Sequence, residues 1–225
     1  MTGRIAIDWD RVKDELFSTE RIPPAEDGSL KHVIHVHAGR SLSEARGLVK
    51  PQWLCETRRI TPSGSAIAVE GGFKIAGERL SSYLRGADDA IFFLLTLGGG
   101  LEEAASCWMK SGEPLYGYLL DRIGSIAAES LAEAVEYSLR IEREKAGRSV
   151  SMRFSPGYSD WPVEEQHTLD KILGFSGIGV RLTEGCMMVP KKSVSGLVAV
   201  GPKDKFSGSR SQCETCGMKD CGYKR

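Results

Sequence analysis

Six residues in the C-terminal half combine a cation, a turn and an aromatic ring, in the order Arg153-Phe-Ser-Pro-Gly-Tyr158. Proline fixes its φ and glycine adopts conformations closed to other residues, so Pro156-Gly157 predicts a tight turn with open backbone amides. A guanidinium can bind a ligand carboxylate through two parallel hydrogen bonds, and tyrosine adds an aromatic face and a hydroxyl. The pattern indicates a small-ligand site. The alternative is an ordinary turn between a surface arginine and a core tyrosine.

A second segment, Ser193-Val-Ser-Gly196, alternates hydroxyl and apolar side chains. Because side chains alternate across a strand, Ser193 and Ser195 should share one face and Val194 should lie on the other. Gly196 leaves room for a ligand or for another backbone. We expect these hydroxyls to share a groove with Arg153 and Tyr158, although an ordinary amphipathic strand would give the same pattern.

Cysteines cluster at the C-terminus as Cys213-x2-Cys216-x4-Cys221. Thiolates at this spacing can bind one metal, and Cys186 is a suitable fourth ligand. The spacing is compatible with an iron-sulfur cluster, with zinc, or with three free thiols on a flexible tail. The same end of the chain is basic, with eight Lys/Arg against three Asp/Glu in residues 191–225, which suits either a solvated tail or a surface for an acidic partner.

Composition excludes several classes of function. The chain has 225 residues with 30 Lys+Arg and 30 Asp+Glu, so its formal charge is zero and gives no general attraction to nucleic acid. No apolar run approaches the length of a membrane span, and the N-terminus lacks the apolar core of a signal peptide. We therefore expect a cytoplasmic protein without nucleic-acid or membrane partners, in which cysteines more often bind metals than form disulfides.

The elements that must position these residues follow from periodicity. Asp8 or Asp10 can cap a helix that runs through Phe17, and the run from Val33 to Val36 among three histidines is too short to assign. The remaining pattern predicts short strands between residues 53 and 75, a buried strand at 90–97, a helix at about 115–143, strands near 149–154, 179–183 and 194–200, and a helix from about 163. Strands scattered among helices favour an α+β fold. We expect one domain over residues 1–207 and a Cys-rich tail over 208–225.

These segments, in this order, resemble the reactivation domain of cobalamin-dependent methionine synthase, which binds S-adenosylmethionine. The matching residues are Arg153-x-x-Pro-Gly-Tyr158, Leu182-Thr-Glu184, Met188-x-Pro190 and Ser193-Val-Ser-Gly196, with weaker matches at Asp121-Arg122, Ala127-Ala128-Glu129 and Ile7-Asp8-Trp9. The resemblance implies a C-shaped α+β domain with a twisted antiparallel sheet and flanking helices.

The resemblance also implies a set of ligand contacts. Arg153 would bind the methionyl carboxylate, and Tyr158 would pack on the ligand. Backbone contacts would come from Ser155 and Gly157, strand contacts from Ser193 and Ser195, stacking from Phe206 and Ser207 at a family Tyr-Ser pair, and amino-group contacts from Glu129 and Asp8. Without gaps, the family's helix glutamate aligns with Ser125 rather than with Glu129.

The implied function is reductive remethylation of a corrinoid protein, in which S-adenosylmethionine supplies the methyl group. Reduced cobalamin is a strong nucleophile, so the protein needs to hold the methyl in line and needs no catalytic acid or base. Cobalamin would come from a partner, and reduction requires an electron donor. The alternatives are an iron-sulfur electron-transfer protein or a zinc-stabilised interaction subunit on the same scaffold.

Overall fold

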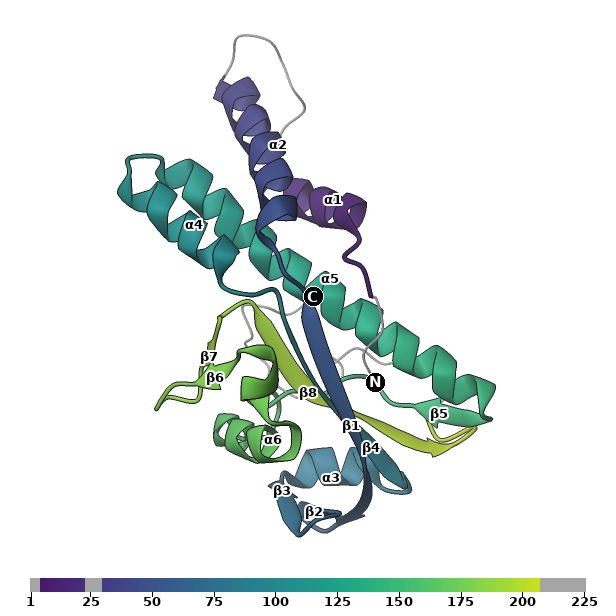
Figure 1. Ribbon diagram of the computed structural model, residues 1–225. Coiled ribbons are helices and arrows are strands. Elements are labelled where there is room, and N and C mark those ends of the chain that lie inside the picture. The colour runs from purple at the N-terminus through teal and green to yellow at the C-terminus, as the bar shows by residue number, and fades with distance from the viewer. Residues whose placement is uncertain (1–4, 23–29, 207–225) are drawn as a thin grey trace.

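The computed structural model describes residues 5–22 and 30–206, which fold into an antiparallel sheet with helices on both faces (Figure 1). The six-stranded sheet has the order β3-β2-β1-β4-β8-β5, and every neighbouring pair is antiparallel. Its strands are β1 (Gln52–Ser63), β2 (Ala66–Val69), β3 (Phe73–Ala76), β4 (Asp89–Thr96), β5 (Arg148–Val150) and β8 (Ser193–Pro202). A separate hairpin contains β6 (Arg181–Leu182) and β7 (Met188–Val189).

Six α-helices surround the sheet within the described residues. They are α1 (Trp9–Thr19), α2 (Leu30–Leu48), α3 (Glu78–Leu84), α4 (Gly100–Lys110), α5 (Pro114–Lys145) and α6 (Gln166–Leu173). Helix α5 lies between the sheet and the helices α1, α2 and α4, whereas α3 and α6 cover the other sheet face (Figure 1). None of these helices is both long enough and apolar enough to cross a membrane.

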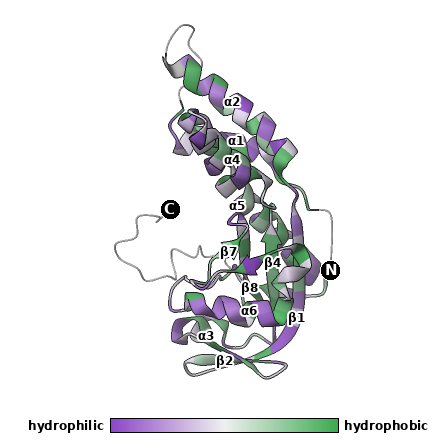
Figure 2. Cartoon of the chain, turned by 60° about the vertical axis from the view of Figure 1, so that its left-hand side comes forward, coloured by the Kyte–Doolittle hydropathy of each residue, from purple (hydrophilic) through white to green (hydrophobic). Residues whose placement is uncertain are grey.

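Strand β4 lies at the centre of the molecule and is buried on both faces. Ile91, Phe93 and Leu95 join the cluster beneath α5, while Phe92 and Leu94 join the cluster beneath α6. Alternate side chains of a strand point to opposite faces, so a strand covered on both sides is continuously apolar. Figure 2 shows this concentration of hydrophobic residues on β4 and β8. Strand β4 thus contributes side chains to both hydrophobic clusters.

Helix α5 packs closely because it carries small residues at its contacts. A Cβ at Gly117 would come within 2.6 Å of the carbonyl oxygen of Ala105 on α4, and one at Gly124 would come within 2.8 Å of Leu101. At 32 residues the helix is about 48 Å long. It therefore connects the helical part of the molecule to the sheet.

The predicted α+β class, the central strand and the long helix are confirmed. Asp8 is the cap of α1, because its Oδ1 accepts a hydrogen bond from the Arg11 amide at 3.0 Å. The histidine run from 32 to 37, which had no assigned structure, is part of α2 and not a strand. Its position in a helix follows from packing: Ile34, Ala38 and Leu42 face the core while Val33 and Val36 are exposed.

Candidate ligand site

Arg153 and Glu129 form the central contact of the candidate site. Arg153 follows β5 and precedes Phe154, which forms an isolated bridge with Leu197 of β8. Its Nη2 donates to Oε2 of Glu129 on α5 at 2.7 Å. The arginine side chain is 13% exposed and the glutamate side chain 43% exposed. A buried guanidinium thus meets a carboxylate that solvent or a ligand can reach.

The turn after Arg153 is present, but its amides are engaged. Gly157, at φ 90°, donates its N–H to the Trp161 carbonyl at 2.8 Å, and the Tyr158 amide donates to the Ser155 carbonyl at 3.2 Å. The expectation of open amides is therefore wrong at these two positions, because the turn uses them to close itself. Tyr158 is 53% exposed, which also excludes the alternative of a core tyrosine.

The two serines of β8 point away from Arg153, contrary to the expected shared groove. Ser195 donates to Oε1 of Gln166 on α6 at 2.7 Å, and Ser193 contacts the hydroxyl of Thr96 at 2.8 Å. Both serines are buried on the face covered by α6. Arg153 reaches α5 on the opposite face. The strand alternation was predicted correctly, but sequence alone did not show which face carries the arginine.

Gly196 makes room for backbone and not for a ligand. A Cβ at this position would overlap the carbonyl oxygen of Phe154. This oxygen accepts the Leu197 amide at 2.8 Å, and the Phe154 amide donates back to the Leu197 carbonyl at 2.9 Å. The glycine therefore fixes the chain just after Arg153 against β8.

Other predicted residues lie in different surroundings. Phe206 is buried and its ring stacks on Tyr83 at 6.0 Å, while Tyr83 meets Phe154 edge to face. Cys186 is buried in the β6–β7 turn with a left-handed backbone, φ 60°. Ser207 and the tail cysteines Cys213, Cys216 and Cys221 lie outside the described residues. Within residues 5–22 and 30–206 no three His, Cys, Asp or Glu side chains are grouped closely enough to bind a metal.

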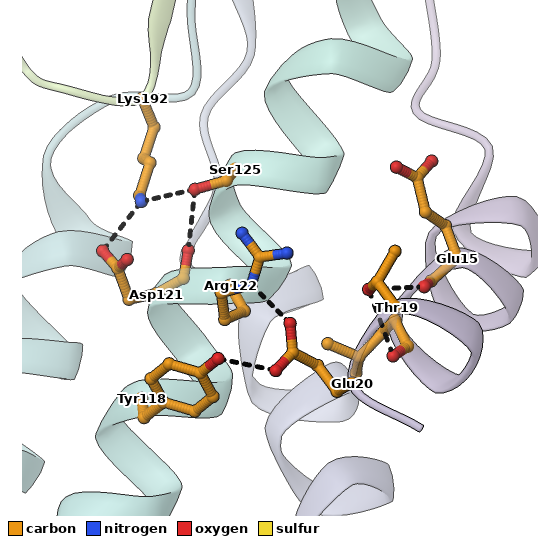
Figure 3. A network of polar contacts seen from close by, with 9 residues as sticks. Glu15, Thr19, Glu20, Tyr118, Asp121, Arg122, Ser125 and Lys192 are labelled. Atoms are coloured by element: carbon orange, nitrogen blue, oxygen red, sulfur yellow. Dashed lines mark hydrogen bonds and ion pairs between the residues drawn. The ribbon is translucent and has the colours of Figure 1, made fainter. Parts of the chain in front are cut away.

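A neighbouring polar network on α5 was not predicted (Figure 3). Lys192 lies just before β8, and its buried Nζ contacts Asp121 Oδ1 at 2.7 Å and Ser125 Oγ at 2.9 Å. Ser125 is thus engaged by a lysine ammonium from the chain itself. Only the Lys-Lys pair before the strand could have indicated this contact, and such a pair usually lies in solvent.

A second network fastens α1 to α5 (Figure 3). Glu20 accepts hydrogen bonds from the Tyr118 hydroxyl and from Arg122 Nε, both at 2.6 Å. Burial tends to raise the pKa of Glu20, but these hydrogen bonds and the Arg122 charge outweigh it and lower the pKa. This contact fixes the C-terminal end of α1 against α5, and Asp8 caps the other end of α1.

Asp8 borders a hollow of about 490 Å³ between α1 and α5. Arg11 and Glu133 form an ion pair in its wall, and Tyr137 is exposed beside it. Glu133 is one helical turn beyond Glu129, so both project from the same side of α5. The hollow therefore adjoins the helix surface that contacts Arg153.

A solved structure shares the fold of this protein. A crystal structure described as the MetH reactivation domain bound to AdoHcy superimposes with a TM-score of 0.64. The alignment covers 94% of this chain and 79% of the other chain, at 17% sequence identity, and so shows a common fold. No curated protein gives a significant sequence match.

Family membership follows from the sequence itself. The profile of the family described as "Vitamin B12 dependent methionine synthase, activation domain" matches residues 81–211, more than half of the chain. The matched range includes Glu129, the Arg153–Tyr158 turn and all of β8. This chain therefore belongs to the vitamin B12 dependent methionine synthase activation domain family.

Proposed function

We propose that this protein binds S-adenosylmethionine beside Arg153 and Glu129 and supports the reductive methylation of a corrinoid protein. The observation that carries the proposal is the pairing of a buried guanidinium with a half-exposed carboxylate. An amino acid ligand carries the complementary pair of charges, a carboxylate and an ammonium. Such a ligand can replace one ion pair by two without leaving a buried charge unpaired.

The chemistry of the remaining side chains fits this ligand. Arg153 would bind its carboxylate, while Glu129 and Asp8 would attract its ammonium group. Tyr158 offers an exposed ring for packing. A backbone contact from Gly157 would use its carbonyl oxygen, because its amide already donates to Trp161, and Ser155 would contribute a second backbone contact. Phe206 would act indirectly, by holding Tyr83 against the segment next to Arg153.

The bound cofactor would supply a methyl group activated by the positive sulfonium. The residues of this chain would hold and orient it, and the half-exposed Glu129 would add favourable negative potential. No residue needs to transfer a proton. The reaction further requires a corrinoid protein as methyl acceptor and a one-electron donor. Because the methyl acceptor is a corrinoid, the proposed partner is a corrinoid-binding module.

Calorimetric titration of the purified, reduced protein with S-adenosylmethionine and with AdoHcy tests the proposal. We expect both ligands to bind, and Arg153→Ala to weaken binding by about 100-fold because a charge-assisted bidentate contact is lost. Arg148→Ala is the matched control, since Arg148 pairs with Asp88 and with the Gly201 carbonyl, at the opposite end of β8 from Ser193. Absence of binding in the wild type, or equal effects of the two variants, contradicts the proposal.

The tail supports a separate proposal, that Cys213, Cys216, Cys221 and Cys186 bind one metal centre. The described residues hold no group of three candidate ligands, and Cys186 is the buried one of their three free thiols. Anaerobic purification followed by metal and sulfide analysis distinguishes an iron-sulfur cluster from zinc. Cys213→Ser should remove the metal and Cys107→Ser should not. A metal-free wild type overturns the proposal.

A further inference from the structure

A hollow of about 290 Å³ is lined by residues of α1 and α2 and by none of the Arg153–Tyr158 turn. It is lined by Lys13 and Phe17 of α1 and by His35, Gly39, Leu42, Ser43 and Arg46 of α2. The two helices come from the N-terminal part of the chain, before the range matched by the family profile. None of the ligand residues proposed above lines this hollow.

The lining is basic and its charges are not compensated. Lys13 and Arg46 are exposed on facing helices, and no acidic side chain lines the hollow. Within the described residues neither of these two side chains forms an ion pair. In the hollow beside Asp8, by contrast, Arg11 is paired with Glu133. Two unpaired cations facing one cavity create a positive potential there.

Aromatic rings hold these cations at the walls. The Lys13 ammonium lies 6.0 Å from the ring centre of Phe17, and the Arg46 guanidinium lies 5.6 Å from the ring of Trp9. The imidazole of His35 meets the Phe17 ring edge to face at 5.1 Å. Cation–π contacts restrict long side chains without neutralising their charge. The basic groups therefore remain available to an anion.

Small residues of α2 keep the space between the walls open. A Cβ at Gly39 would meet nothing within 4 Å. Ser43 lies one turn further along the same helix face and brings a hydroxyl that can donate to an anion. The hollow therefore has cations on opposing walls and a neutral donor in the lining.

We propose that this hollow binds a phosphate group, either as free inorganic phosphate or as the phosphate of a small monoester. A phosphate near pH 7 carries about 1.5 to 2 negative charges and several acceptor oxygens. It can accept hydrogen bonds from Lys13, Arg46 and Ser43 at once, whereas a carboxylate matches only one of the two charges. The site is independent of the proposed S-adenosylmethionine site.

Phosphorus NMR and calorimetric titration of the full chain with inorganic phosphate, at fixed ionic strength, test this site. We expect saturable binding, and Lys13→Gln combined with Arg46→Gln should raise the dissociation constant at least about tenfold. Lys74→Gln, an exposed lysine on β3, should leave binding unchanged. A parallel titration with glycerol phosphate distinguishes the sources: tighter binding than inorganic phosphate identifies the monoester as the ligand, and equal or weaker binding identifies the free ion.

A second variant separates a built site from general attraction by positive charge. Gly39→Leu keeps every charge, fills open space and improves helix propensity, so it should abolish phosphate binding without lowering the melting temperature. Absence of wild-type binding, or undiminished binding in the charge variant or in Gly39→Leu, overturns the proposal. Unchanged S-adenosylmethionine binding in these variants, and unchanged phosphate binding in Arg153→Ala, would confirm that the two sites are separate.

Discussion

Near the Arg153 turn, the two faces of β8 differ in the charge and the exposure of their polar side chains. On the face covered by α6, Ser195 and Gln166 form a neutral hydrogen bond between fully covered side chains. On the face covered by α5, Arg153 contacts a carboxylate that is nearly half exposed. A buried neutral pair stabilises one arrangement, because opening it leaves unsatisfied groups. A charged pair at the edge of solvent can exchange one partner for a ligand. Substitutions on the α6 face should therefore change mainly stability, and substitutions on the α5 face should change mainly ligand binding.

The largest effect should come from Gly196, because the backbone next to Arg153 packs directly against this residue of β8. Gly196→Ala would place a methyl against the Phe154 carbonyl, so we expect it to lower the free energy of unfolding by about 3 kcal/mol or more and to disturb ligand binding as well. Thermal and urea unfolding measure the effect. Gly177→Ala, where a Cβ meets nothing, is the control. Equal stability of the two variants would show that the strands can separate freely here.

Ser195 tests the α6 face alone. Ser195→Ala removes the donor to Gln166 and leaves a buried acceptor, so it should lower the free energy of unfolding by about 2 kcal/mol. Ligand affinity should not change. Urea titration and calorimetry on the same preparation measure both quantities, with the exposed Ser176→Ala as control. A large loss of affinity at unchanged stability would restore Ser195 to the ligand site.

Glu129 tests the α5 face. Glu129→Ala should weaken S-adenosylmethionine binding by about tenfold, roughly 1.4 kcal/mol, because the ligand ammonium loses its counter-charge. Stability should change less, since the glutamate is half exposed. Glu142→Ala on the same helix should have no effect on binding. If Glu129→Ala instead strengthens binding, the arginine–glutamate pair competes with the ligand and does not assist it.

The smallest expected effect is a pH dependence of stability that comes from Tyr116, in the first turn of α5. Burial, and then the hydrogen bond that Tyr116 donates to Glu44, raise the pKa of Tyr116 from 10.0 to about 12. The folded state thus favours the protonated phenol, and this stabilisation is complete below pH 10 and is lost between about pH 10 and 12. Thermal unfolding across this range should show a loss that Tyr116→Phe reduces by about 1 kcal/mol. The exposed Tyr137→Phe should behave like wild type.

Periodic patterns predicted the elements well. The three-and-four spacing marked α5 and the continuous apolar run marked β4, because burial on a stripe or on two faces leaves a direct trace in sequence. The helical structure of the histidine run in α2 was not predicted, since exposed Val33 and Val36 between histidines give neither period clearly.

The site was predicted only in part. The turn between Arg153 and Tyr158 was predicted from its Pro-Gly pair, but the partner of Arg153 depends on how α5 lies across the sheet. Nothing local distinguishes Glu129 from other acids on that helix. The direction of Ser195 toward Gln166 on α6 and the contact of Lys192 with Ser125 likewise depend on long-range packing.

Because β4 contributes alternate side chains to both hydrophobic clusters, neither cluster can melt while the other stays intact. Scanning calorimetry of this chain should then record a single heat-absorption peak. The amides of β4, paired on both edges by β1 and β8, should be the last to exchange with deuterium, and they should exchange only when the whole described fold opens.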